Sequence, residues 1–185
     1  RCVLKRRTGY EVWYGLVGSE MWIKDSFNVD AHSVGLEDLK RRVKTEVDIT
    51  FDLFDKLTCF DLLMTHCIEP KMLKVLLFVY DYPHESAALA SLGTNAQGQK
   101  VERRFEAYLN GLELANGYYE LTDAIEQKKR FEKDVKNRHD NSLAPVPFDK
   151  HLVAALESGM PACAGVALGV DRLLMVLGEK SSINE

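Results

Sequence analysis

Residues 101–123 read VERRFEAYLNGLELANGYYELTD, and the rest of the sequence is best read outward from this stretch. Polar and apolar residues alternate up to Leu109, which predicts a strand, and a second strand-like run begins at Leu112. Asn110 and Gly111 stand between the two runs. Asn-Gly is typical of a type I′ turn, because both central residues of that turn need a positive φ. The stretch therefore predicts a β-hairpin with a two-residue turn.

The turn fixes the register of the hairpin and places two acids on one face. Tyr108 is expected opposite Glu113, and Glu106 opposite Ala115. Because successive side chains point to opposite faces of a strand, Glu106 and Glu113 then lie diagonally across one face. One cation could bridge two acids placed in this way. The alternative is an exposed hairpin face whose acids are simply solvated.

The run Ala115-Asn116-Gly117 interrupts the second strand. Strict alternation would place Asn116, Tyr118 and Glu120 on the face opposite Glu113. A glycine inside a strand often marks a β-bulge, which re-aims the side chains that follow it. A bulge here would bring these three side chains to the face of Glu113, where all four could converge on one pocket.

Size and composition indicate one domain without a global attraction to nucleic acid. The chain has 185 residues, of which 46% are hydrophobic, enough for one ordinary core. The net charge is -4 and the pI is about 5.8, so the protein as a whole has no basic field. Basic runs at 40–42 and 128–130 fit local patches or, as the plainer alternative, the solvated faces of amphipathic helices.

The four cysteines contain no CxxC pair, and the five histidines show no zinc-ligand spacing. This usage fits a reducing cytosol and a cytoplasmic protein. No apolar run approaches the length needed to span a membrane, and no signal peptide is visible, so no membrane partner is expected.

Residues 1–72 carry no motif with evident chemistry and are expected to form a helical packing layer or insertion. Apolar residues at helical spacing predict helices over 36–47, with Ser33 as the cap, and over 58–67. The aromatic-rich run at 10–23 fits a short helix or irregular apolar packing.

A short apolar run, KVLLFVY at 74–80, predicts a strand that is buried on both faces and ends at residues 81–83. The loop that follows, 83–92, lies where the end of such a strand would meet a ligand. His84 and Glu85 in this loop are candidate site residues or, alternatively, face solvent.

Beyond the hairpin, Thr122 or Asp123 is expected to cap a helix that runs to about Arg138, with apolar positions that include Ile125. Asp149 is expected to cap a further helix.

Residues 164–177 read AGVALGVDRLLMVL and predict a strand followed by a helix. Gly165 and Gly169 permit close approach of the backbone to a ligand. Arg172 offers a planar cation that can stack on a base and pair with phosphate. The alternative for Asp171 and Arg172 is a local salt bridge.

Two segments carry a resemblance to a known family. GLELANGYYELTDAIEQKKRFE resembles the lysine-pocket strand and following helix of class II aminoacyl-tRNA synthetases of the lysyl type, and MPACAGVALGVDRLLMVL resembles their motif 3. Within these segments, ELANG and GVALGVDR are most similar to the branch of that family that attaches (R)-β-lysine to a lysine of elongation factor P. The similarity runs from about Phe78 to Leu177. It implies an α+β fold in which 73–185 form the C-terminal part of a class II core, an antiparallel sheet flanked by helices.

The resemblance also implies a chemistry. ATP, with Mg²⁺, and lysine or β-lysine would form an acyl-adenylate, and the acyl group would pass to a lysine of elongation factor P. One alternative is a lysine-tRNA ligase, with tRNA as the acceptor. Another is a catalytically silent paralogue that binds ATP or amino acid. The full-length protein would be a homodimer.

Site residues follow from the same resemblance. The metal ligands would be Glu106 and Glu113. The nucleotide would contact Glu113, Leu114, Gly169 and Arg172, with Arg172 as the catalytic residue. The amino acid would contact Asn116, Tyr118, Glu120 and Ala167, with Glu120 facing the substrate ammonium. Lysyl-tRNA synthetases usually carry glycine where this chain has Ala167, and the elongation factor P ligases carry alanine.

Motifs 1 and 2 of the family precede this region, and no match to them occurs in residues 1–72. Both ends of the chain look cut. These 185 residues alone are therefore expected not to activate an amino acid, and robust pyrophosphate exchange by them would contradict this.

Overall fold

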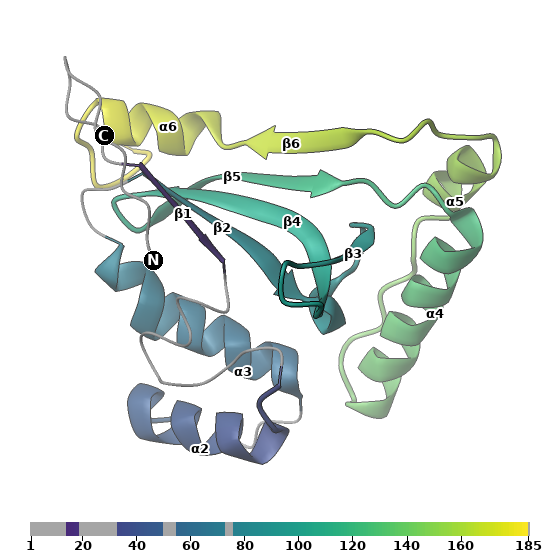
Figure 1. Cartoon of the computed structure of the whole chain (residues 1–185), viewed down its shortest axis with the longest axis horizontal. Helices are drawn as coiled ribbons and strands as arrows, with labels where there is room; N and C mark the ends of the chain where they lie inside the picture. Colours follow the sequence, from purple (N-terminus) through teal and green to yellow (C-terminus); the bar gives the residue numbers. More distant parts are fainter. Residues whose placement is uncertain (1–13, 19–32, 50–54, 73–75, 185) are drawn as a thin grey trace.

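The computed structural model describes residues 14–18, 33–49, 55–72 and 76–184, and in this part of the chain a six-stranded sheet is flanked by helices (Figure 1). The strand order is β1-β2-β4-β5-β6, with β3 paired to β4. β1 is parallel to β2, and the other neighbouring strands are antiparallel. The strands are β1 Tyr14–Gly18, β2 Leu76–Pro83, β3 Leu92–Thr94, β4 Lys100–Leu109, β5 Leu112–Tyr119 and β6 Ala164–Leu168. The predicted α+β arrangement is confirmed.

The helices form separate groups around the sheet. In Figure 1, α2 and α3 lie together on one side of it, α4 and α5 stand at its far end, and α6 continues from β6. Three short helical turns, η1 to η3, complete the described elements. The helices are α2 Leu36–Val47, α3 Lys56–Leu63, η1 Met64–Ile68, η2 Glu69–Lys71, η3 His84–Ser86, α4 Ala124–Asp140, α5 Lys150–Glu157 and α6 Val170–Leu177.

The main core lies between the α2-α3-η1 layer and the sheet. Helical spacing in α2 buries Leu39 and Val43 completely, as the sequence predicts. These residues belong to one apolar cluster with side chains of the sheet such as Leu77 and Val79. One predicted detail is wrong: the N-cap of α2 is Gly35, with no side-chain cap, rather than Ser33.

The helix predicted over 58–67 begins earlier, at Lys56. Asp55 caps it by accepting a hydrogen bond from the Thr58 backbone N–H at 2.8 Å. The helix then loosens into η1, and Pro70 follows in η2. The aromatic run at 10–23 contains a strand, β1, rather than a helix or irregular packing; its other residues lie outside the described part.

Strand β2 departs from its predicted form in two ways. Its burial alternates between buried and half-buried side chains, so it is not buried on both faces. It also continues through Pro83. Asp81 has a positive φ of 57° and interrupts the pairing of β2 with β4. This irregularity turns Tyr82, in place of Asp81, toward the face that carries the site.

The hairpin turn is of the predicted kind. Asn110 has φ 55° and Gly111 φ 76°, both positive as a type I′ turn requires. A Cβ added at Gly111 would stand 2.7 Å from the carbonyl oxygen of Glu69, so the turn packs directly against η2. The helical layer and the hairpin are therefore fitted to each other at this glycine.

Helices α4 and α5 begin at the predicted caps. Asp123 accepts two backbone N–H bonds at the start of α4, and Asp149 does the same for α5. Ile125 is 70% exposed and is not part of an apolar face, contrary to the sequence-based expectation. Phe131 does pack, with its ring stacked on Phe148.

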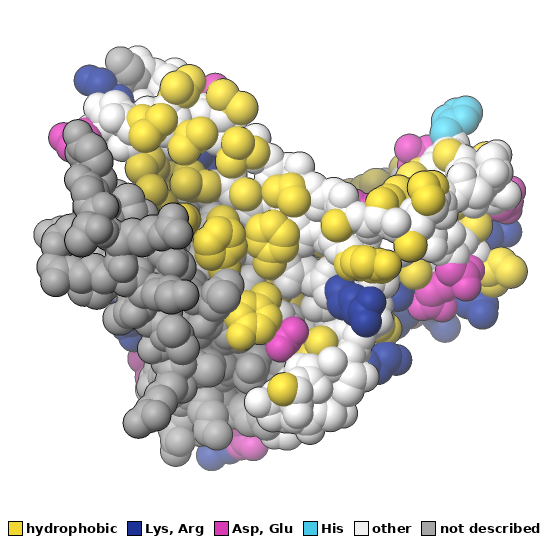
Figure 2. All heavy atoms as spheres, turned by 45° about the horizontal axis from the view of Figure 1, so that its top comes forward, with side chains coloured by type: hydrophobic (Ala, Val, Ile, Leu, Met, Phe, Trp, Pro, Cys, Tyr) yellow, Lys and Arg dark blue, Asp and Glu magenta, His cyan; other side chains and the backbone are white. Residues whose placement is uncertain are grey.

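The two basic runs lie on helices α2 and α4, where several of their side chains form ion pairs with acids of the same helix. Arg130 does not belong to a solvated face, because it is 14% exposed and donates to the backbone oxygens of Ala87 and Ala90. Apolar side chains are exposed elsewhere, on β6 and α6, and Figure 2 shows hydrophobic atoms gathered on this side of the molecule. More than half exposed are Val166, Leu168, Val170, Leu174 and Leu177. Among the described residues, no helix has the length and apolar character needed to cross a membrane.

Candidate active site

A β-bulge in β5 gathers the site residues on one face of the sheet. Tyr108 lies opposite Glu113, as predicted, but Glu106 lies opposite Asn116 rather than Ala115. The extra residue is Leu114, so the bulge falls just before the predicted run Ala115-Asn116-Gly117. The consequence is the predicted one, because residues 116, 118 and 120 move to the face of Glu113.

Gly117 has a different function from the one predicted. A side chain there would collide with the ring of Phe105 on the opposite face of the sheet, so glycine admits that ring. The bulge does not depend on it.

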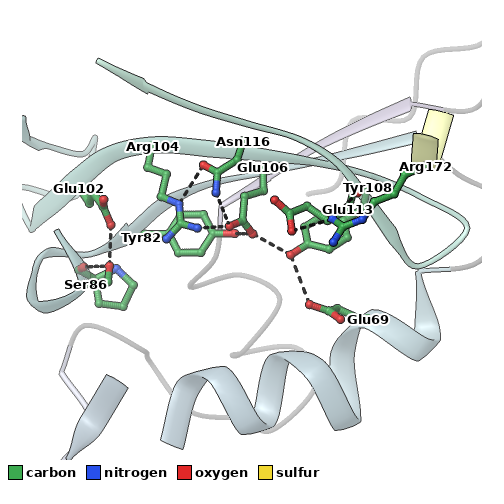
Figure 3. Close-up of polar contacts among 11 residues, drawn as sticks. Glu69, Tyr82, Ser86, Glu102, Arg104, Glu106, Tyr108, Glu113, Asn116 and Arg172 are labelled. Atoms are coloured by element: carbon green, nitrogen blue, oxygen red, sulfur yellow. Dashed lines mark hydrogen bonds and ion pairs between the residues drawn. The ribbon is translucent and has the colours of Figure 1, made fainter. Parts of the chain in front are cut away.

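Glu106 is the centre of a buried hydrogen-bond network (Figure 3). Its side chain is almost fully buried and accepts four hydrogen bonds. One oxygen accepts from the hydroxyls of Tyr82 and Tyr108, and the other from the Arg104 guanidinium and the Asn116 amide. Four donors match the four lone-pair positions of a carboxylate, so the Glu106 side chain is held in one orientation.

The charge at Glu106 affects its neighbours. Burial raises the pKa of the Tyr82 and Tyr108 hydroxyls, and the Glu106 charge raises it further, so both remain hydrogen-bond donors. Burial works against the charge of Arg104, but Glu106 together with Tyr82, Tyr118 and Glu102 outweighs burial, so the pKa of the guanidinium is raised.

The residues predicted to contact the nucleotide meet at the junction of β5 and α6. Arg172 donates to the backbone oxygen of Glu113 at 2.9 Å and pairs with its carboxylate at 3.3 Å. Leu114 has a buried side chain, and its backbone oxygen accepts from the N–H of Gly169 at 2.8 Å. The ion pair shown for Arg172 thus joins it to β5 rather than to Asp171. The side chain of Arg172 stays half exposed.

The residues predicted to contact the amino acid lie farther along the same face. Asn116 pairs with Ala167 of β6, and Tyr118 with Gly165. A side chain at Gly165 would collide with a carboxylate oxygen of Glu120, so this glycine makes room for Glu120. The structure therefore brings together the predicted residues 116, 118, 120 and 167, and adds Gly165 to them.

A cleft of about 200 Å³ lies between the helical layer and the part of this face that carries Arg104, Glu106 and Glu113. Leu57, Phe60 and Met64 form part of its apolar wall, and Glu69 lies at its edge. The Tyr108 hydroxyl lies 3.3 Å from Glu69, whose carboxyl pKa is raised mainly by burial. Residues of the segment 55–72 thus border this cleft, although residues 1–72 carry no motif with evident chemistry in the sequence.

Glu102 forms a second buried acid site on β4. It is 1% exposed, and the Ser86 hydroxyl lies 2.6 Å from both the Glu102 carboxylate and the carbonyl oxygen of Pro83. Ser86 has one proton for these two acceptors, so both contacts are favourable when Glu102 is protonated. Burial also raises the pKa of Glu102, which agrees with this. His84 and Glu85, by contrast, are exposed and pair with each other.

Mg²⁺ usually takes one or two carboxylates together with substrate phosphates and water, and Glu113 fits that use. Its side chain is 34% exposed and lies in the cleft lining. Glu106 fits less directly, since four protein donors already occupy its oxygens. Among the described residues, no three acid, histidine or cysteine side chains form a preformed metal cage.

The sequence analysis did not identify several residues that border the site. Glu102 and Arg104 alternate with Glu106 along β4, so the hairpin register could have identified them. Tyr82 could not be found in this way, because the irregularity at Asp81 changes its face. Glu69 reaches the site only through the packing of η2 on the hairpin.

Comparison with known proteins identifies the family of the chain. Residues 20–185 match the family model of class II tRNA synthetases (D, K and N). The chain is 52% identical over 123 residues to the elongation factor P–(R)-β-lysine ligase of Vibrio vulnificus (strain YJ016). The matched stretch covers 66% of this chain and 38% of that protein. It is 46% identical over 132 residues to the ligase of the same name from Edwardsiella ictaluri (strain 93-146), covering 71% and 40%.

The chain spans about two fifths of the length of these curated relatives. The family model, however, matches most of the chain, and both segments that carry the sequence resemblance lie within the match. The chain belongs to the class II (D, K and N) tRNA synthetase family.

Proposed function

We propose that the full-length protein activates a lysine-like amino acid with ATP and transfers the acyl group to a lysine of elongation factor P. The observation that carries the proposal is the convergence of two residue groups on one sheet face. Arg172 and Glu113, which form an ion pair, would serve the nucleotide, and Asn116, Tyr118 and Glu120 would serve the amino acid. The names of the relatives support the same acceptor and amino acid.

In the first half-reaction, the carboxylate of the amino acid attacks the α-phosphorus of ATP and pyrophosphate leaves. Arg172 would bind the nucleotide with the exposed part of its guanidinium, while Glu113 holds that side chain in place. Gly169 has φ -76°, and an added Cβ would meet its nearest neighbour at 3.5 Å. No described part of the chain therefore requires glycine there, which agrees with a close nucleotide.

Glu113 would hold Mg²⁺, which would supply positive charge that neutralises the phosphates and orients them for in-line attack. Glu106 could bind the metal ion only if one of its four hydrogen-bond donors moved away. We therefore assign the metal ion mainly to Glu113.

Glu120 would select the substrate by pairing with its ammonium group. A carboxylate facing an ammonium in a site closed to water makes a charge-assisted contact, and leaving either partner unpaired is costly. Ala167, next to Asn116, adds one methyl group to the pocket wall relative to glycine. Such a difference is worth about 1–3 kcal/mol of discrimination. We infer that it favours β-lysine and the elongation factor over α-lysine and tRNA.

In the second half-reaction, the amine of the acceptor lysine attacks the acyl carbon, AMP leaves, and the amine gives up a proton. The proposal includes a cytoplasmic location and a homodimeric full-length protein, both of which rest on the family resemblance.

The test offers both acceptors at once. The full-length gene product is incubated with ATP, Mg²⁺ and either α- or β-lysine, together with elongation factor P and tRNA. Intact mass and tRNA acylation are then recorded. The proposal predicts a mass gain on elongation factor P that is larger with β-lysine. Charged tRNA with unmodified protein would indicate a lysine-tRNA ligase, and no product would indicate a silent paralogue.

A further inference from the structure

Arg104 contacts both of the pocket residues that precede Glu120. It stands on β4 directly opposite Tyr118 of β5. Its Nε–H donates to the side-chain oxygen of Asn116 at 3.2 Å, and its Nη2 pairs with Glu106 (Figure 3). The side chain is only 21% exposed, so these contacts form in a largely desolvated place.

Arg104 and Glu106 together determine which way the Asn116 amide points. The amide oxygen accepts from Arg104, while the amide nitrogen donates to Glu106 at 3.2 Å. A rotated amide would set N–H against N–H at Arg104 and oxygen against carboxylate at Glu106. Both contacts would be repulsive, so one orientation is strongly favoured. Asn116 is left with one N–H and one oxygen lone pair for a ligand.

The guanidinium also holds a tyrosine ring on each side. Its carbon lies 4.7 Å from the ring centroid of Tyr82 on β2 and 5.6 Å from that of Tyr118 on β5. Both distances are within the range of cation–π contacts. Arg104 thus links three neighbouring strands at the point where the amino-acid pocket begins.

We infer that Arg104 is a positioning residue that sets the Asn116 amide and the Tyr118 ring for the amino-acid substrate without binding ATP. The inference rests on the proposed function, because that function assigns Asn116 and Tyr118 to the amino acid. Lysine at position 104 would retain the charge beside Glu106 but would lack the planar fork that reaches Asn116 and stacks on the rings.

The strand offers a matched control. Arg103 lies next in sequence on the opposite face of β4, and its guanidinium stands 5.3 Å from the ring centroid of Tyr119. Arg103→Lys therefore makes the same chemical change, on the same strand and at a similar stack, away from the site.

The first measurement needs no catalysis. In the NMR spectrum of the full-length gene product, the Asn116 side-chain amide should show one proton protected from solvent exchange by its bond to Glu106. Arg104→Lys should remove this protection, and Arg103→Lys should retain it. Unchanged protection in Arg104→Lys would overturn the positioning of Asn116, whatever reaction the protein catalyses.

The second measurement is amino-acid-dependent ATP–pyrophosphate exchange by the same variants. Arg104→Lys should raise the KM for the amino acid about 10-fold and leave the KM for ATP within about 2-fold. In an Asn116→Ala background, the same change should raise this KM clearly less than about 10-fold, because only the contact with Tyr118 remains for it to act through.

The outcomes separate the two claims. No exchange by the wild type with α- or β-lysine would overturn the proposed function, while the amide measurement still decides the orientation of Asn116. Two results would overturn the positioning role alone, provided that the wild type shows exchange. One is that Arg104→Lys and Asn116→Ala multiply fully in their effects on the KM for the amino acid. The other is that Arg104→Lys raises the KM for ATP as much as the KM for the amino acid.

Discussion

At the scale of single residues, Gly165 and Glu120 give the sharpest structure–function prediction. Gly165→Ala would place a methyl group where a carboxylate oxygen of Glu120 now lies. Only the end of a side chain must move, so the free energy of unfolding should change little. The pocket, however, loses its aligned acid, and the KM for the amino acid should rise about 10- to 100-fold. Pyrophosphate exchange and thermal unfolding of the full-length variant check this. A large loss of stability, or an unchanged KM, would contradict it.

Glu102 predicts a pH dependence of stability. Burial raises the pKa of its carboxyl above the usual 4.5, so the folded state keeps a proton that the unfolded chain loses. Wild-type stability should therefore fall as the pH rises from about 4.5 through the folded-state pKa. Glutamine cannot ionise, so Glu102→Gln should lack this fall. Its stability relative to the wild type should rise across that window by about 1.4 kcal/mol per unit of pKa shift.

Denaturant titrations of both proteins between pH 4 and 8 measure this difference, and the exposed Glu157→Gln serves as the control. If the stability of Glu102→Gln relative to the wild type instead stays constant or falls with rising pH, Glu102 is charged in the folded state.

At the scale of elements, the hairpin, the helices 36–47 and 124–140 and the final strand–helix unit could be predicted because their signals are local. Turn residues, caps and periodicity act within a few residues. The irregularities at Asp81 and Leu114 could not be placed in this way. Where a strand takes an extra residue depends on the partner strand and on what packs above it. The sequence indicated that a bulge would gather the pocket residues, and only its position was wrong.

The packing of the hairpin turn on η2 gives an element-scale prediction with a matched control. Gly111 and Gly98 both have a positive φ, 76° and 79° respectively. An added Cβ would meet nothing within 4 Å at Gly98 but would stand 2.7 Å from the Glu69 carbonyl oxygen at Gly111. Gly98→Ala should therefore cost about 1 kcal/mol of unfolding free energy for the backbone conformation alone, and Gly111→Ala about 2–3 kcal/mol. Equal losses would show that η2 does not constrain the turn.

At the scale of the whole molecule, the site lies where the sheet face meets the helical layer. The sheet supplies Glu106, Glu113, Asn116 and Tyr118, which share one face because of the bulge at Leu114, while Gly169 and Arg172 come from the start of α6. The layer supplies the opposite wall of the cleft and the acid Glu69. Its part in the site could not be predicted, since contacts between residues such as Glu69 and Tyr108, 39 positions apart, depend on the tertiary fold.

The central claim is that Glu120 and its neighbours on this face select a lysine-like amino acid for activation. The most direct test is ATP–pyrophosphate exchange by the full-length gene product with β-lysine, α-lysine and norleucine, in the wild type and in Glu120→Gln. We predict exchange with the lysines and almost none with norleucine, which has no side-chain ammonium. We also predict that Glu120→Gln loses most of the exchange while its KM for ATP is unchanged. Exchange with norleucine comparable to that with lysine, or a fully active Glu120→Gln, would contradict the account.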